Sequence, residues 1–163
     1  MTRTFVAVMS GICFAAYCSA ARAEELPKSG AFTVHSGWKG VGETTQVAEG
    51  RTYLFGSFWG VVFNDKGSGP LHEGPSVCSY TLELLNGALT GQGQCTWGDV
   101  DGDKIFSDYT GSMPPKSQWD AMVKLTGGTG KYSGIQGKAS EQCKPLNASG
   151  QWACTENFEY RLP

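Results

Sequence analysis

Two cysteines placed symmetrically about a turn signal constrain this chain more than any other feature. Asn86-Gly87 separates two segments in which polar and apolar residues alternate, and this is the strongest local signal for a two-residue β-hairpin turn. Such a turn places Cys78 directly opposite Cys95 at a non-hydrogen-bonded position, where Cα atoms lie about 4.5 Å apart. A disulfide tolerates that separation. The sequence therefore predicts a hairpin over residues 77–97 with a disulfide between its two strands.

A second cysteine pair repeats the arrangement near the carboxyl terminus. Cys143 and Cys154 are symmetric about residues 147–150, and a four-residue loop there also places the two cysteines opposite each other. Four cysteines allow three connectivities in principle. Two independent coincidences of spacing favour Cys78–Cys95 and Cys143–Cys154 over the crossed pairings.

The amino terminus has the pattern of a secretory signal. A short basic region precedes an apolar stretch over 5–20 and an A-x-A sequence at 21–23, which predicts a signal peptide over residues 1–23. A transmembrane anchor is the alternative, but the stretch is shorter than the ~20 apolar residues that a spanning helix needs. Lipidation at Cys18 is a further alternative, which the bulky Tyr17 disfavours. We therefore expect one exported domain over 24–163, periplasmic or secreted, that does not span a membrane and carries its disulfides in an oxidising compartment.

Charge and composition exclude several functions. Without Arg3 and Arg22, the chain holds 11 basic and 15 acidic residues with no basic run, so nucleic acid and anionic membrane surfaces are unsuitable partners. The sequence contains no C-x-x-C motif or Cys/His cluster that would predict a zinc site. No cofactor is expected. Glycine, at 23 residues, is about twice as frequent as its usual ~7%, which fits strands and turns.

Alternation along the chain predicts eight or nine antiparallel strands and hence a closed barrel or a sandwich. We expect a first strand over 31–38, a break at 39–42 and a short strand over 44–48. The next segment, 51–63, is apolar on both faces, so both faces should be covered, by a neighbouring loop or by a second subunit. A homo-oligomer is therefore a candidate assembly.

Two glutamates form the most informative polar constellation. The register set by the second cysteine pair places Glu141 opposite Glu156 on the apolar face of its hairpin. Buried carboxyl groups in such a pair share a proton and one pKa rises, which suits acid–base chemistry or a bound cation. A bulge that turns one glutamate outward, or a position at the wet mouth of the barrel, is the alternative.

Three aspartates follow the first hairpin. Asp99, Asp101 and Asp103 resemble a calcium loop, but they lack the glycine at position six and the distant glutamate of an EF-hand. Asp101-Gly102 also fits a type I′ turn that would pair Asp99 with Lys104 and Trp97 with Phe106. We favour the turn and keep the metal as the weaker alternative.

A glycine-rich segment carries a family resemblance. Residues 125–137 contain Gly-Gly-Thr-Gly-Lys-Tyr, which resembles the G-G-[ST]-G-x-[FY] turn shared by plant dirigent proteins and allene oxide cyclases. Together with the Cys-Thr-Trp-x-Asp-x-Asp-Gly-Asp segment at 95–103, it makes the chain look like a bacterial exported version of that barrel. The resemblance implies an all-β, eight-stranded antiparallel barrel, often oligomeric, with a largely apolar central cavity.

The functions of these families set the expectations for this chain. Allene oxide cyclases isomerise an unstable fatty-acid epoxide, and dirigent proteins steer radical coupling. Our leading hypothesis is binding of a small, mainly apolar molecule in the cavity. The alternatives are an isomerase or cyclase with Glu141 or Glu156 as acid or base, and a filled barrel that assembles through the 51–63 strand. The residues expected to line the cavity, besides the two glutamates, are Tyr80, Leu82, Trp97, Phe158 and Tyr160.

Overall fold

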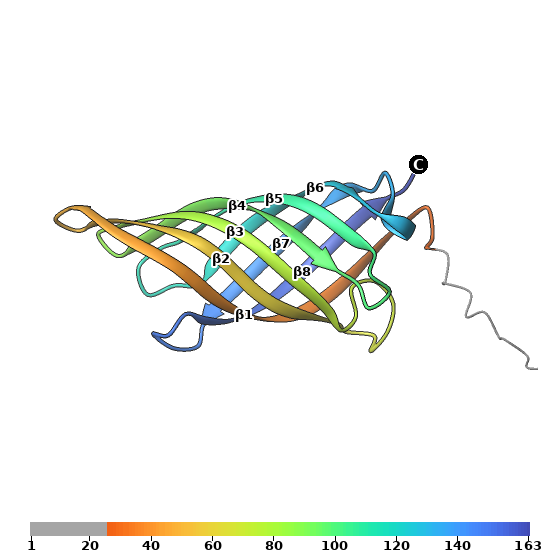
Figure 1. The fold of residues 1–163 in the computed structure, drawn as a ribbon, viewed down its shortest axis with the longest axis horizontal. Helices are drawn as coiled ribbons and strands as arrows, with labels where there is room; N and C mark the ends of the chain where they lie inside the picture. The colour runs from red at the N-terminus through yellow and green to blue at the C-terminus, as the bar shows by residue number, and fades with distance from the viewer. Residues whose placement is uncertain (1–25) are drawn as a thin grey trace, which may run out of the picture.

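A computed structural model describes residues 26–163 as a closed barrel of antiparallel strands (Figure 1). Each strand pairs with its neighbours in sequence, and the last strand closes onto the first. The strands are β1 (Ser29–Ala48), β2 (Arg51–Asn64), β3 (Gly74–Leu85), β4 (Ala88–Gly98), β5 (Lys104–Met113), β6 (Trp119–Gly128), β7 (Gln136–Pro145) and β8 (Gln151–Arg161), with one short 3-10 helix, η1 (Gly130–Tyr132). The predicted eight-stranded antiparallel barrel is confirmed. The signal peptide predicted for 1–23 lies outside the described residues. The described part of the chain contains no helix that is long and apolar enough to cross a membrane.

Both predicted hairpins and both disulfides are confirmed. Asn86 and Gly87 have φ values of 50° and 85°, as a type I′ turn requires at its two central positions. Cys78 pairs with Cys95 in the β3–β4 ladder, and their Cα atoms are 4.0 Å apart. In the β7–β8 ladder the disulfide partners Cys143 and Cys154 have Cα atoms 4.1 Å apart.

The break predicted at 39–42 is wrong, because β1 runs without interruption through these residues. Gly40 and Gly42 are paired with Phe58 and Gly56 of β2. A Cβ atom at Gly40 would lie 2.8 Å from the Phe58 ring, and one at Gly42 would lie 2.4 Å from the hydroxyl of Tyr80. The glycines are therefore sites of close approach within a strand rather than the end of one.

The same arrangement, a glycine beside a large side chain, recurs around the interior of the barrel. A large inward side chain lies over a glycine of an adjacent strand, so a barrel of only eight strands can hold several bulky rings. A Cβ atom would collide with such a side chain in the following glycine and side-chain combinations: Gly60 with Trp38, Gly91 with Leu82, Gly93 with Tyr109, and Gly111 with Trp119. Leu82 and Tyr109 therefore occupy the space beside Gly91 and Gly93.

The two ends of the barrel differ in their connections. At what we call the turn end, the strands are joined by residues 49–50, 86–87, 114–118 and 146–150, and the β1–β2 hairpin projects beyond the rest (Figure 1). At the opposite end, the loop end, the strands are joined by residues 65–73, 99–103 and 129–135, and the first and last of these are longer than any connection at the turn end. Leu71 and Tyr132 from these loops are fully buried with Trp97 and Ile105 of the strands. The loop end is thus packed solid.

The β2 strand is covered on one face only within the single chain. Its inward residue Val62 is fully buried, whereas the outward residues remain exposed, up to 60% for Trp59. The exposed apolar side chains of this outer face are Phe55, Trp59, Val61 and Phe63. The sequence suggested a loop as one possible cover for this face. His72 of the 65–73 loop packs edge-to-face on Phe63, with ring centroids 6.2 Å apart, but the face stays largely exposed.

Candidate functional site: a cavity walled by two disulfides

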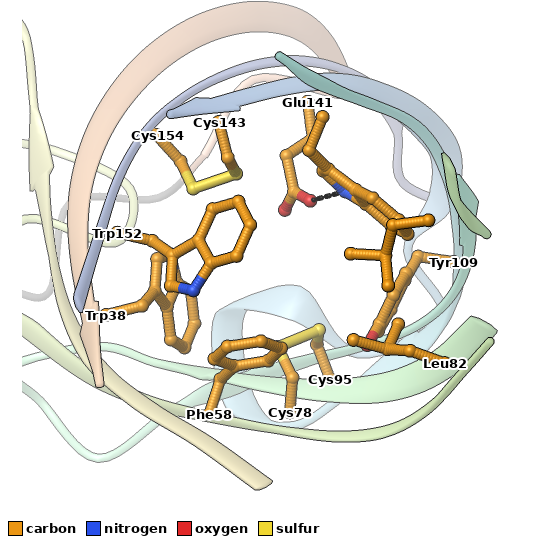
Figure 2. A pocket seen from close by; sticks show the side chains of 12 residues that line it. Trp38, Phe58, Cys78, Leu82, Cys95, Tyr109, Glu141, Cys143, Trp152 and Cys154 are labelled. Carbon is orange, nitrogen blue, oxygen red and sulfur yellow. Dashed lines mark hydrogen bonds between the residues drawn. A yellow bond between two sulfur atoms is a disulfide. The ribbon is translucent and has the colours of Figure 1, made fainter. Parts of the chain in front are cut away.

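The interior of the turn-end half encloses a cavity of about 50 Å³ (Figure 2). Phe58, Glu141 and Trp152 in its wall are only half-buried, so solvent reaches it. Because a water molecule occupies ~30 Å³ of the liquid, the cavity accepts a group of a few heavy atoms. The residues that line it are Trp38, Phe58, Cys78, Leu82, Leu89, Cys95, Tyr109, Trp119, Glu141, Cys143, Trp152 and Cys154.

Aromatic rings from three strands form one side of this wall. Phe58 of β2 and Trp152 of β8 are edge-to-face, with ring centroids 6.3 Å apart, and Tyr80 packs behind Phe58 at 4.7 Å. The indole of Trp38 donates a hydrogen bond from Nε1 to Ser36 Oγ at 2.6 Å. These contacts hold the rings in place, and carbon and sulfur atoms make up most of the cavity wall.

Glu141 supplies the ionisable group of the wall. Figure 2 shows its carboxyl pointing into the cavity, where Oε1 accepts a hydrogen bond from Trp119 Nε1 at 3.0 Å. The part of Glu141 that is accessible faces this enclosed space, because the rest of the barrel wall surrounds it. Burial raises the pKa of Glu141 to about 7, and the hydrogen bond from Trp119 opposes that rise only in part.

Glu156 lies directly opposite Glu141 in the β7–β8 ladder and is fully buried behind the cavity wall. Its Oε1 accepts a hydrogen bond from Ser36 Oγ at 2.5 Å, and its Oε2 has no hydrogen-bond partner. Burial, and then the charge of Glu141, raise the pKa of Glu156 to about 8. The ladder has no bulge or register shift around the pair, so both carboxyl groups belong to the interior.

The two glutamates have no basic partner. No lysine, arginine or histidine lines the cavity. Among residues 26–163 the ion pairs all join other side chains. Near neutral pH the pair therefore keeps protons that exposed glutamates would lose, and it can donate a hydrogen bond, exchange a proton or accept a cation.

The predicted ligand-binding residues separate into two groups. Leu82 lines the cavity, whereas Tyr80 lies outside the lining, packed behind the ring of Phe58. Trp97 and Phe158 are 5.4 Å apart, edge-to-face, in the packed interior. Tyr160, also buried, contacts that layer through Phe32. The structure thus differs from the expectation for these three residues, since they fill the barrel instead of lining its cavity.

Sequence analysis missed most of the aromatic wall. Trp119 begins β6 and is paired with Cys143, and it was not among the residues expected to line the cavity. Its alternation with Ala121, Val123 and Leu125 was the available signal. Trp38, Tyr109 and Trp152 point inward by strand parity, but only the pairing of distant strands places them around one cavity.

The three aspartates belong to the loop end. Asp99 is buried, and its Oδ2 accepts hydrogen bonds from the Tyr132 hydroxyl at 2.5 Å and from the Leu71 backbone N–H at 3.1 Å. Lys131 Nζ lies 3.2 Å from Asp99 and 2.8 Å from Asp101. Burial alone would raise the pKa of Asp99, but these donors and the Asp101 backbone together lower it. The cluster therefore joins the β4–β5 loop to η1.

The turn predicted at Asp101-Gly102 is wrong by one residue in register. Trp97 is paired with Ile105 rather than with Phe106, so Ile105 is buried and Phe106 lies on the outside. The buried side chain of Asp99 draws residues 99–103 into a longer loop, in which Asp99 N–H donates to the Asp103 carbonyl at 2.9 Å. Within residues 26–163 no three His, Cys, Asp or Glu side chains are arranged to hold a metal ion.

Comparison with known proteins returned no match to a family model, to a curated protein or to a solved structure. The resemblance of residues 125–137 to dirigent proteins and allene oxide cyclases therefore stays a prediction. The geometry of the cavity carries the functional argument.

Proposed function

We propose that this protein binds a small, mainly apolar molecule in the turn-end cavity. The observation that carries the proposal is a space walled by aromatic, aliphatic and sulfur groups, with one carboxyl group, that of Glu141, aimed into it. Binding sites are typically apolar hollows with a few well-placed polar groups. Both disulfides lie in the wall, so the site is built on the most strongly cross-linked part of the barrel.

The size of the cavity limits what enters it. At about 50 Å³ it is far smaller than the 300–1,000 Å³ of pockets that enclose a drug-sized ligand. One end of the ligand would occupy the cavity, and the remainder would extend towards solvent past the half-buried rings of Phe58 and Trp152.

Export is part of the same proposal. Two disulfides within one small domain are typical of proteins that fold in an oxidising compartment, and the pattern at 1–23 predicts the signal. The glycine-rich segment supports membership of the allene oxide cyclase and dirigent-like barrels, as an exported bacterial member.

A cavity-filling variant tests the binding proposal. Leu82→Trp should abolish retention of small apolar molecules, because its side chain faces the cavity, whereas Thr81→Trp adds the same ring on the exposed outer face of the same strand. Native mass spectrometry of each protein, purified from the envelope of its own host, reports retained molecules and the two disulfides together. Equal retention by wild type and by Leu82→Trp, with both folded, would refute the cavity as the binding site.

Catalysis in the cavity is the second candidate. A carboxyl group with a pKa of about 7 is well matched to general acid–base work near neutral pH, and Glu141 is placed to reach a bound molecule. If the retained molecule is turned over, Glu141→Gln should lower the turnover rate by ~100-fold or more with binding preserved. Unchanged turnover would exclude Glu141 as the acid or base.

Self-association through β2 is the third candidate, and the exposed Phe55, Trp59, Val61 and Phe63 favour it. Exposed apolar patches of this kind are typical of interaction sites. Light scattering coupled to gel filtration should show an oligomer that Trp59→Lys converts to monomer. A wild-type protein that is monomeric at high concentration would exclude this role.

A further inference from the structure

The carboxyl groups in and behind the turn-end cavity have no basic residue beside them. Glu141 faces the cavity and Glu156 lies directly behind it, and no basic side chain lines the space. Oε2 of Glu156 is buried without any hydrogen-bond partner, although buried polar atoms nearly always have one. A pair of this kind is incompletely satisfied by the protein alone and favours a positively charged guest.

The aromatic wall favours the same guest. Ring faces carry partial negative charge and attract ammonium groups, most strongly where water is excluded. Trp38, Phe58 and Trp152 surround the space that the Glu141 carboxyl enters, and Figure 2 shows Trp152 and Glu141 on either side of one opening. A carboxylate among several aromatic rings provides both the ion pair and the cation–π contacts that an alkylammonium group needs.

We infer that the ligand of the turn-end cavity is an organic cation, a protonated alkylamine whose ammonium group pairs with Glu141 between the aromatic rings. This inference rests on the proposed binding function and names its chemical class. The cavity volume of about 50 Å³ suits the ammonium head and its first carbon atoms, and the alkyl tail extends towards solvent.

The protonation of Glu141 before binding decides whether a proton is released when the ligand binds. The raised pKa of Glu141 keeps it protonated below about pH 7, so the empty cavity carries little buried charge. When the ammonium enters, the Glu141 proton passes to solvent and an N–H of the ligand donates to the carboxylate; no covalent bond changes. The titratable groups that face Glu141 are Glu156 on β8 and Tyr109 on β5. Burial, and then the charge of Glu141, raise the pKa of Tyr109 and keep it neutral in this range.

A neutral ligand with a hydrogen-bond acceptor is the competing class, because protonated Glu141 can donate to it. Three probes with one alkyl chain separate the classes: butylammonium, 1-butanol and butanoate. Calorimetric titration should give butylammonium at least about tenfold tighter binding than 1-butanol, and no binding of butanoate. Titrations at pH 6.5 in two buffers of different ionisation enthalpy should show release of about one proton for each ion bound, falling towards zero by pH 9.

Matched variants identify the carboxyl group responsible. Glu141→Gln should remove the preference for butylammonium and the proton release while retaining weak binding of 1-butanol. Glu159→Gln makes the same change on the exposed outer face of β8 and should leave both unchanged.

Each other outcome overturns a defined part of the argument. Equal affinity for butylammonium and 1-butanol, both lost in Leu82→Trp, would overturn the cation and leave the binding proposal intact. Preference for butanoate or 1-butanol would likewise overturn it. If none of the probes binds, and the wild type retains no more than Leu82→Trp from its host, both proposals fail.

Discussion

The same eight strands surround both ends of this barrel, but side chains fill the interior at the loop end and leave a cavity at the turn end. At the loop end, Leu71 and Tyr132 reach inward from connections outside the strands, and both are fully buried. At the turn end, two of the connections contain only two residues, 49–50 and 86–87, and the pocket lining includes no residue from the turns. The cavity therefore lies at the end of the barrel where no connection is as long as the two, 65–73 and 129–135, that supply Leu71 and Tyr132.

The two ends also treat buried carboxyl groups in opposite ways. Asp99 at the loop end receives hydrogen bonds from several donors, and its pKa is lowered. Glu141 and Glu156 receive few, and burial raises their pKa values to about 7 and about 8. Asp99 is therefore held as an anion that joins two loops, whereas the glutamates keep their protons to a higher pH and can exchange them.

The largest expected difference between the ends is in packing. Tyr132→Ala should lower the free energy of unfolding by about 3–5 kcal/mol, because it empties a fully buried site. Trp152→Ala should cost no more than about 2 kcal/mol, because that ring is half-exposed beside an existing cavity. Guanidinium unfolding with the disulfides intact measures both. Equal losses would mean that the turn end is packed as firmly as the loop end.

The next largest expected effect is the pH dependence of stability that the two turn-end glutamates produce. The glutamates bind protons more tightly in the folded state than at their ordinary value of 4.5, so unfolding releases protons between about pH 4.5 and 8. The contribution of the pair to stability is full below that range and falls as the pH rises through it, by on the order of 3 kcal/mol or more.

Glu156→Gln is the matched test of that pH effect. It should flatten the decline and leave a protein that is more stable than wild type at pH 9, whereas Glu159→Gln on the outside should follow the wild-type curve. A wild-type free energy of unfolding that is constant from pH 5 to 9 would contradict the assignment of raised pKa values.

The smallest expected effect is at the loop end, where the pH dependence of stability has the opposite sign. Asp99→Asn should cost about 1–3 kcal/mol at pH 7, because Lys131 and the Tyr132 hydroxyl lose their anionic acceptor. Since the pKa of Asp99 is lowered, its contribution is present above its ordinary value of 3.8 and is lost as the pH falls below it. Unfolding curves for wild type and variant should therefore converge in acid. A gap that persists at pH 2 would show that shape, rather than charge, matters at this position.

Local register was predictable from the sequence, and the cavity was not. The Asn86-Gly87 turn and the two cysteine pairs fix the ladders of β3–β4 and β7–β8, including the position of Glu141 opposite Glu156, because short connections leave one pairing available. The raised pKa of such a pair was predicted on the same basis.

The errors arose where distant parts of the chain meet. The register at Trp97 depends on a hydrogen bond from Tyr132 to Asp99 across 33 residues. The place of Trp119 in the wall depends on its pairing with β7. Neither contact has a local signal, so Trp97 was expected to line the cavity and Trp119 was not.

The closure of β8 onto β1 has a practical consequence. Leu162 N–H donates to the Lys28 carbonyl at 2.7 Å, so the chain enters and leaves the barrel side by side at the loop end (Figure 1). A short linker could join these ends, and new termini could be opened at 86–87, giving a circular permutant with the same ladders. A support or fusion partner attached at either terminus of the barrel domain would likewise hold the protein by its loop end, with the cavity facing outward.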